Sequence, residues 1–412
     1  MGALRPRPTE RVRTTRAEQR GIGAQKVIRT LFVFGTRPEA IKLCPVVQRL
    51  MREREVFDVR VCITAQHREM LDQVLEVFKI KPHYDLNTML PAQTLLQSTS
   101  HMLAELGTVL KHAVPDIVLV QGDTTTTLCG AMSAFYSGIP IGHIEAGLRT
   151  GDMRQPFPEE MNRVMVSRLA NLHFAATERA ANNLRLEGVP NQFITVTGNS
   201  GIDAVLQVKA RLESGALIGR EWPEIDPRRK LILVTAHRRE SFGAGFERIC
   251  TALKLIAKRT DVQIIYPVHP NPNVSGPVRE RIGSQSNVHL IAPLDYVSFV
   301  DLMRRAHLLL TDSGGVQEEG PSLGKPILVM REKTERPEAV EAGTAELVGS
   351  DVEKIVSAAF TLLDDEVEYA RRSRIHNPYG DGHASDRIAT ALHGFFSKSA
   401  RTSQVAQGVE AP

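Results

Sequence analysis

Residues 308–319 read Leu-Leu-Leu-Thr-Asp-Ser-Gly-Gly-Val-Gln-Glu-Glu, and this stretch decides the class of fold. Its apolar start predicts a buried strand, and the turn at Ser313-Gly314-Gly315 predicts that a helix follows at once. Such a helix leaves backbone N–H groups unpaired at the positive end of its dipole, which suits a diphosphate. Glu319 lies about one turn further on, where a carboxylate can accept hydrogen bonds from the vicinal hydroxyls of a ribose. A turn whose glycines serve only tight packing would leave a similar pattern, so the interpretation needs support from other segments.

Short apolar runs, each followed by a helical pattern, recur on both sides of this stretch. They occupy residues 29–35, 59–64, 116–123 and 139–145, and then 230–235, 262–266, 289–291, 307–311 and 326–330. Runs without polar alternation, separated by helices, are typical of parallel sheets covered on both faces. The sequence therefore predicts an α/β protein with two Rossmann-like, doubly wound domains. Ligands of such sheets bind at the carboxyl ends of the strands, so the active site is expected in the cleft between the domains.

The series of apolar runs and helical patterns is interrupted near residue 200, and this interruption sets the expected boundaries. We predict an N-terminal domain that carries catalytic carboxylates and a C-terminal domain that binds a nucleotide, followed by a helix that can pack back on the first domain. Both ends of the chain are expected to be disordered tails, the first of them basic. In chain order these five parts are residues 1–26, 27–200, 201–376, 377–396 and 397–412.

Charge and cysteine content exclude several classes of protein. The formal net charge is +4, and residues 1–25 carry six Arg against Glu10 and Glu18, so the remainder is about neutral. Nucleic-acid binding proteins instead cluster basic residues on the folded part. The four cysteines stand singly in apolar segments and are expected to be buried thiols of a reducing, cytoplasmic compartment. No apolar stretch reaches the roughly 18 residues that cross a bilayer, so no membrane partner is expected.

Two cations follow the first expected strand. Residues 35–42 read Gly-Thr-Arg-Pro-Glu-Ala-Ile-Lys, which places Arg37 at the turn and Lys42 about one turn into a helix. Both can reach over the cleft toward phosphate oxygens. Two cations in a first turn can also form a merely solvated face.

Three carboxylates are expected to converge at one end of the first sheet. Asp123 and Glu145 each follow a strand. A helix is expected to begin at Pro158, which places Glu159 in its first turn. Carboxylates gathered in a cleft acquire shifted pKa values and supply proton donors and acceptors near neutral pH. Each has a structural alternative: Asp123 can cap its helix, Glu145 can pair with Arg149, and Glu159 or its neighbour can serve only the helix dipole.

A histidine offers a further phosphate ligand from the second half. His237 follows the strand 230–235 and is itself followed by two arginines. A lone histidine after a strand is usually structural, whereas one beside two arginines favours contact with phosphate.

Together these segments resemble the non-hydrolysing UDP-N-acetylglucosamine 2-epimerase family. The resemblance covers residues 27 to about 396 and rests on nine segments in the same order, three of them eight or nine residues long. The segments are residues 34–42, 64–68, 122–127, 143–150, 158–160, 235–240, 312–319, 334–338 and 377–382.

The resemblance implies two domains in the glycosyltransferase-B arrangement, a homodimer, and reversible conversion of UDP-N-acetylglucosamine to UDP-N-acetylmannosamine without metal or other cofactor. It implies that UDP leaves by anti elimination and re-adds to a glucal intermediate, and that the product supplies a surface polysaccharide. By the same resemblance the catalytic residues are Asp123, Glu145, Glu159 and His237, and the UDP-binding residues are Arg37, Lys42, His237, Phe299, Ser313, Gly314, Gly315, Glu319 and Arg336.

Some positions depart from the family pattern, and two of them concern activation. Many bacterial members bind a second substrate molecule as an activator, with a glutamine and an arginine where this chain has Glu69 and Ala92. The sequence therefore predicts weak activation at most. Three other functions remain open: a hydrolysing epimerase that releases N-acetylmannosamine and UDP, a retaining glycosyltransferase of the same fold, and a sensor without catalysis. The last two have no need of three carboxylates on the first domain.

Overall fold

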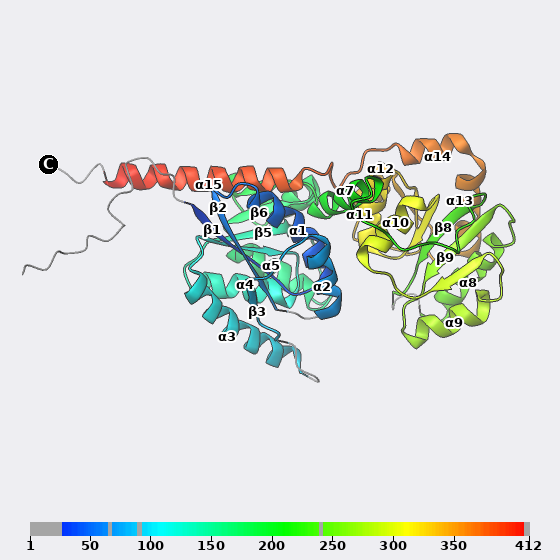
Figure 1. Ribbon diagram of the computed structural model, residues 1–412, viewed down its shortest axis with the longest axis horizontal. Coiled ribbons are helices and arrows are strands. Elements are labelled where there is room, and N and C mark those ends of the chain that lie inside the picture. Colours follow the sequence, from blue (N-terminus) through cyan, green and yellow to red (C-terminus); the bar gives the residue numbers. More distant parts are fainter. Residues whose placement is uncertain (1–26, 65–67, 89–92, 239–241, 408–412) are drawn as a thin grey trace, which may run out of the picture.

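Two parallel sheets flanked by helices form the protein (Figure 1). The computed structural model describes residues 27–64, 68–88, 93–238 and 242–407, with side chains to residue 398. The predicted tail 1–26, the positions Ala92 and 239–241, and the last five residues lie outside the described residues. The predicted α/β fold with two Rossmann-like sheets is confirmed.

The first sheet lies in the N-terminal part of the chain. In its described residues it has seven parallel strands in the order β3-β2-β1-β4-β5-β6-β7. The strands are β1 (Ile28–Phe34), β2 (Phe57–Ile63), β3 (Tyr84–Asp85), β4 (Ile117–Gln121), β5 (Ile141–Ala146), β6 (Leu172–Ala175) and β7 (Ile194–Val196). Its helices are α1 (Arg37–Met51), α2 (Arg68–Val77), α3 (Leu95–Ala113), α4 (Thr125–Tyr136), α5 (Glu159–Leu169) and α6 (Glu178–Leu186).

The second sheet has six parallel strands in the order β10-β9-β8-β11-β12-β13 among the described residues. These are β8 (Lys230–Thr235), β9 (Val262–Pro267), β10 (Val288–Ile291), β11 (Leu308–Thr311), β12 (Ile327–Val329) and β13 (Ala345–Leu347). Its helices are α8 (Ala244–Ile256), α9 (Pro272–Ile282), α10 (Tyr296–Arg305), α11 (Gly314–Glu319), α12 (Pro337–Ala342), α13 (Val352–Asp364) and α14 (Glu366–Ser373). In each sheet the order in which strands are added reverses beside the first strand, between β1 and β4 and between β8 and β11. Such folds bind ligands at this point.

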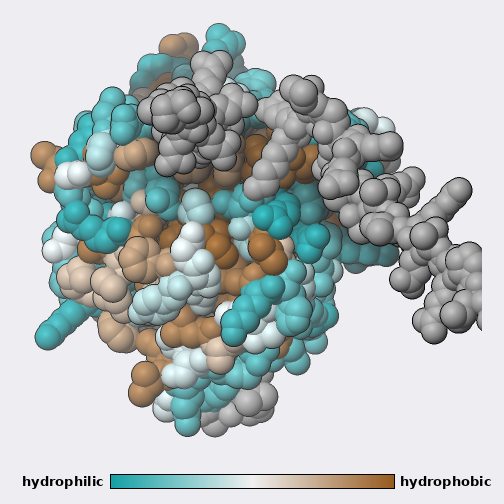
Figure 2. All heavy atoms as spheres, turned by 90° about the vertical axis from the view of Figure 1, so that its left-hand side faces the viewer, coloured by the Kyte–Doolittle hydropathy of each residue, from teal (hydrophilic) through white to brown (hydrophobic). Residues whose placement is uncertain are grey.

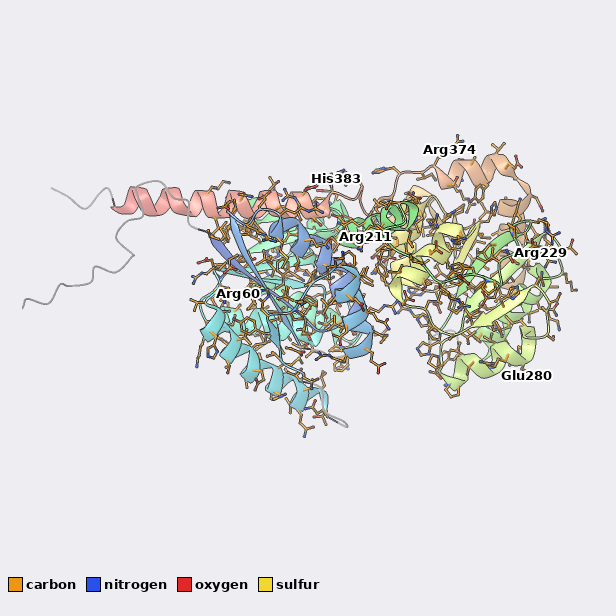
Figure 3. The ribbon with its side chains drawn as sticks, in the orientation of Figure 1. Arg60, Arg211, Arg229, Glu280, Arg374 and His383 are labelled. Carbon is orange, nitrogen blue, oxygen red and sulfur yellow. The ribbon has the colours of Figure 1, made fainter. Side chains whose placement is uncertain are left out.

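The helix α7 (Ser200–Glu213) joins the two halves, and it lies between them in Figure 1. One apolar cluster runs through it, including Ile202 and Val205 of α7 and Val300 of α10. Arg211, labelled in Figure 3, donates a hydrogen bond of 2.7 Å from Nη1 to the carbonyl of Val77 at the end of α2. The two halves are therefore packed through a shared helix.

The chain crosses between the halves twice, at neighbouring points. The backbone N–H of Asn199 donates to the carbonyl of Tyr379 at 2.7 Å, and Gly198 contacts Gly380 so closely that an added Cβ would lie 3.3 Å from its Cα. Both glycines have positive φ, at 84° and 145°, which favours glycine over any residue with a side chain. The two crossing segments therefore lie against each other.

After the second crossing, α15 (Ala384–Gln407) runs back along the first half. Its His393 lies 2.7 Å from the carboxylate of Glu53, at the end of α1. The helix starts seven residues after the predicted start at 377, because Asn-Pro and two glycines precede it. The tail predicted from 397 stays a prediction; among the described residues α15 continues to Gln407 through a stretch that contains neither Gly nor Pro.

Burial follows the sequence pattern. All four cysteines are free and buried, as predicted. None of the helices in the described ranges is long and apolar enough to cross a membrane. Figure 2 views the molecule from the end of the first half, where hydrophobic side chains gather in the middle of the face and hydrophilic ones surround them.

Candidate active site

Asp123 stands in the turn between β4 and α4. Gly122 before it has a φ of 70°, and Thr124 after it caps α4 by accepting the N–H of Thr127 at 3.1 Å. The alternative that Asp123 caps this helix is therefore wrong. Its carboxylate instead faces Arg163 of α5, with 2.7 Å between Oδ2 and Nη2. Desolvation raises the pKa of Asp123 above its ordinary value, although the positive charge of Arg163 opposes the rise.

Glu145 is the last residue but one of β5 and has a strained backbone conformation. Its φ is 62°, and the pairing of β5 with β6 shifts register at this residue. The carboxylate contacts the ammonium of Lys42 and the side-chain amide of Gln121. The alternative pair with Arg149 is wrong, because Arg149 binds Glu187 at 2.6 Å. Strain of this kind persists only where the surroundings enforce it, and it is concentrated at functional sites.

Lys42 connects Glu145 with the second half. Its Nζ also lies 3.8 Å from the carboxylate of Glu318 on α11, which in turn binds the guanidinium of Arg336. Burial by itself would lower the pKa of Lys42, but the carboxylates of Glu145 and Glu318 outweigh it and raise that pKa. Two cations and two carboxylates from opposite halves thus form one buried network.

Glu318 was not singled out from the sequence. It is 4% exposed, and its Oε2 accepts a hydrogen bond of 2.9 Å from the side chain of Asn199 at the first crossing point. Its backbone carbonyl accepts a hydrogen bond of 2.7 Å from Asn377 at the second crossing. Glu318 and Glu319 are adjacent in sequence but have different surroundings. The residue type, which is the same at both positions, does not reveal this difference.

Glu159 and Glu160 separate clearly in their environments. Glu160 is 1% exposed, and its carboxylate accepts the N–H groups of Thr150 and Gly151, each at 3.0 Å. It also lies 3.2 Å from Arg163. Glu159 is only half-buried, and its Oε2 has no hydrogen-bond partner among the described residues. The carboxylate of Glu160 is therefore fully used in structural contacts. Glu159 retains an oxygen that can contact a substrate.

His237 follows β8 and is fixed by its backbone. Its N–H donates to Asp312 Oδ2 at 2.6 Å, and its ring stacks on His269 with centroids 5.6 Å apart. The imidazole remains 43% exposed, so it can contact a ligand. Burial lowers the pKa of His237 below its ordinary value, while Asp312 opposes the change. Asp312 immediately precedes the glycine turn, so His237 and that turn are held together.

The predicted turn at Ser313-Gly314-Gly315 does start a helix. Ser313 occupies the N-cap position of α11, and no side chain caps the helix there. A Cβ at Gly314 would lie 3.4 Å from the guanidinium of Arg336, whereas at Gly315 the nearest atoms would be 4.0 Å away. Near these residues burial raises the pKa of Glu319 to about 8, and the charge of Glu318 adds to the rise.

Arg37 and Phe299 approach from the two sides of the junction. Arg37 opens α1 and donates from Nη1 to the carbonyl of Leu294 at 3.4 Å, just before α10. Phe299 is part of α10 and packs, half-buried, against the apolar cluster that also contains Tyr296 and Val316. Arg37 therefore reaches the second half, and Phe299 lies on the helix that it meets.

Direct contacts join some of the predicted residues across the two halves, through Lys42, Glu145, Glu318 and Arg336. Lys42, Glu145 and Asp123 come from the carboxyl edge of the first sheet, and Glu318, Arg336 and His237 from that of the second. Sequence reasoning missed Glu318, Arg163, Asn199 and Asp312. Asp312 offered one signal, since a carboxylate after a buried strand and before Ser-Gly-Gly resembles the other strand-end acids. The described residues contain no group of three or more His, Cys, Asp or Glu side chains placed to hold a metal ion.

Two facing parallel sheets with a charged site between them define a two-domain α/β enzyme of the glycosyltransferase-B architecture. The family model for UDP-N-acetylglucosamine 2-epimerase matches residues 49–393. The chain belongs to the UDP-N-acetylglucosamine 2-epimerase family.

Individual relatives agree with this assignment. The UDP-N-acetylglucosamine 2-epimerase of Escherichia coli K12 is 55% identical over 370 residues, which cover 89% of this chain and 98% of the relative. A crystal structure of the Neisseria meningitidis UDP-GlcNAc 2-epimerase bound to UDP-GlcNAc matches with a TM-score of 0.83 and 47% identity, covering 89% of this chain and all of that one. A co-structure of S. aureus MnaA with UDP matches with a TM-score of 0.80 and 45% identity over 90% and 97% of the two chains.

Proposed function

We propose that the protein interconverts UDP-N-acetylglucosamine and UDP-N-acetylmannosamine without releasing free sugar. The observation that supports this most directly is the buried network of Lys42, Glu145, Glu318 and Arg336, with Asp123 and Glu159 beside it. Cations that can bind a diphosphate lie next to carboxylates that can transfer protons. Two relatives of this chain were solved with UDP-GlcNAc and with UDP.

The proposed chemistry starts with elimination. A carboxylate removes the hydrogen on sugar carbon 2 as a proton, while the C–H electron pair forms a double bond between carbons 1 and 2. The electron pair of the bond from carbon 1 to oxygen leaves with UDP, so the intermediate is a glucal. Removal of a hydrogen that is not acidic is easiest when the leaving group departs in the same event.

The return step inverts carbon 2. A carboxylic acid delivers a proton to the opposite face of carbon 2, and the UDP oxygen adds again to carbon 1. Asp123, Glu145 and Glu159 are proposed to carry these transfers, with His237 beside the diphosphate. Retention of UDP requires donors aimed at the diphosphate in a closed site, because stabilised UDP stays available for re-addition.

The proposed diphosphate ligands are Arg37, Lys42, His237, Arg336 and the backbone at Ser313, Gly314 and Gly315. Lys42 pairs with Glu145, and Arg336 pairs with Glu318. A diphosphate would compete for these cations, which releases the carboxylates beside the sugar. Glu319 is proposed to bind the ribose hydroxyls, and Phe299 to line the uracil pocket.

Incubation with UDP-N-acetylglucosamine in deuterated water tests the proposal. Both UDP-sugars should form, with deuterium at carbon 2 and no accumulation of UDP, as read by proton NMR. Accumulation of UDP with free N-acetylmannosamine would instead establish a hydrolysing epimerase. Transfer of the sugar to an acceptor, without exchange at carbon 2, would establish a glycosyltransferase.

We further propose a cytoplasmic homodimer that needs no added cofactor and supplies a surface polysaccharide pathway. Exposed apolar side chains on neighbouring helices of the first half support a contact with a second copy; they are Leu95, Leu96, Phe135, Tyr136 and Met165. Analytical ultracentrifugation measures the mass in solution. A monomer at micromolar concentration would contradict the dimer.

A further inference from the structure

The helix α5 holds Asp123 at two points. The side-chain amide of Asn162 donates to the backbone carbonyl of Asp123 at 2.8 Å, and the next residue, Arg163, contacts its carboxylate at 2.7 Å. Arg163 is 5% exposed, so this ion pair is shielded from water on the arginine side. Glu159 lies four residues earlier on the same helix, so one helix supplies a candidate acid and the partner of another.

Arg163 is itself held in place. Its Nη1 lies 3.2 Å from Glu160, whose carboxylate is anchored by the backbone of Thr150 and Gly151. The guanidinium therefore stands between two carboxylates and cannot swing away without leaving a buried charge unpaired. Such a chain of contacts fixes direction as well as distance, since the guanidinium fork is planar and rigid.

Other charges also face Asp123. Three of them are cations and one is a carboxylate; they are Arg163 and Glu159 of α5, Lys42 of α1, and Arg336 next to α12. Lys42 is already in contact with Glu145, and Arg336 belongs to the second half and binds Glu318. Of these cations only Arg163 contacts Asp123 directly from within the same domain. Its effect on Asp123 therefore does not depend on how the two halves approach each other.

We propose that Arg163 is a positioning residue that keeps Asp123 ionised and oriented, so that Asp123 acts as the base at sugar carbon 2. The inference rests on the proposed epimerisation and assigns one direction of its proton transfer. A base must be deprotonated before it reacts, and a desolvated carboxyl without a cation would hold its proton. Removal of an adjacent Arg raises the pKa of an aspartate by about 1–3 units.

The test is the pH dependence of turnover in Arg163→Met, which keeps much of the side-chain volume but loses the charge. The acid limb of the kcat profile should move upward by about 1–2 pH units, and turnover at neutral pH should fall roughly tenfold or more. UDP affinity should stay within about twofold, since charge at carbon 2 is remote from ground-state contacts to the diphosphate. Arg163→Lys should restore the limb toward its original position.

A second measurement separates positioning from mere structural support. In an Asp123→Asn background, Arg163→Met should cause little further loss of turnover, because its effect acts through Asp123. Arg168→Met on the same helix is the matched control, since Arg168 contacts the carbonyl of Glu187 and is expected to leave kcat unchanged. Should Arg163→Met fail to fold, Arg163→Gln gives the same readout with an uncharged donor.

An unmoved acid limb in a folded, UDP-binding variant would overturn the inference and leave the proposed function intact. Additive losses in the double variant would overturn it as well. Absence of any exchange at carbon 2 in the unaltered protein would instead remove the proposed function, and the inference with it.

Discussion

The side-chain amide of Asn199 donates a hydrogen bond of 2.9 Å to the buried carboxylate of Glu318, and so joins the residue before α7 to the helix that begins at the glycine turn. The same carboxylate holds Arg336 and approaches Lys42. The charged centre is therefore attached to the point where the two halves are connected. A change in the distance between the two halves would therefore alter the contacts of Lys42 and Arg336, which we assign to the diphosphate.

We predict that Asp123→Asn, Glu145→Gln and Glu159→Gln each lower kcat by about a hundredfold or more, because a positioned acid or base contributes roughly 10²–10⁴. For Asp123→Asn and Glu159→Gln the UDP affinity should remain nearly unchanged, as measured by calorimetry. A fully active variant would remove its residue from the proton transfer.

Glu160→Gln should act on stability instead. The substitution places an amide against two backbone donors and the guanidinium of Arg163, and a buried mismatch of this kind costs about 1–3 kcal/mol. Thermal unfolding should show a lower Tm, while kcat falls much less than in Glu159→Gln. If Glu160→Gln is instead the variant without turnover, the assignment is displaced by one residue.

His237→Ala and Arg37→Ala should weaken UDP binding itself. Charge-assisted hydrogen bonds to a diphosphate exist before the reaction as well as during it, so their loss appears in Kd. We expect each variant to bind UDP about tenfold more weakly or worse, at about 1.4 kcal/mol per tenfold. Unchanged affinity in both would exclude them from the phosphate site.

Glu319 predicts a pH dependence of stability. Its folded-state pKa of about 8 lies above the ordinary glutamate value of 4.5, so between these values the folded state binds more protons than the unfolded state. The contribution of Glu319 to stability should therefore be largest below the lower value and fall as the pH rises toward 8. Glu319→Gln should flatten this slope in denaturant titrations at pH 5, 6, 7 and 8. A variant with the same slope as the unaltered protein would show that another group causes it.

Activation by substrate is predicted to be weak. Glu69 lies exposed in the first turn of α2, and Ala92 lies outside the described residues, so this prediction rests on the sequence pattern. A second nucleotide sugar would lose a phosphate partner at Ala92 and meet a negative charge at Glu69. Rates from UDP-N-acetylmannosamine alone should follow a hyperbolic curve. A lag that a trace of UDP-N-acetylglucosamine abolishes would contradict it.

The long strands were predictable because their apolar runs lack polar alternation. Strands β3, β6, β7 and β13 were missed, since runs of only two to four residues give little pattern. The turns at Asp123, Glu145 and Ser313 were found because polar residues there interrupt buried strands. Arg163 was missed because a charged residue inside a helix carries no mark of whether it faces water or another charge.

Neighbouring crossings also govern how the molecule can move. Gly198 and Gly380 touch where the chain passes between the halves in opposite directions, and Asn199 and Tyr379 share a backbone hydrogen bond there. Two adjacent connections can act together as a hinge between the halves. Opening and shutting about that line bends both segments alike, whereas twisting one half against the other would stretch one of them. Rotation about that line would change the distance between the carboxylates of the first sheet and the cations of the second, and the paired connections would oppose displacement in other directions.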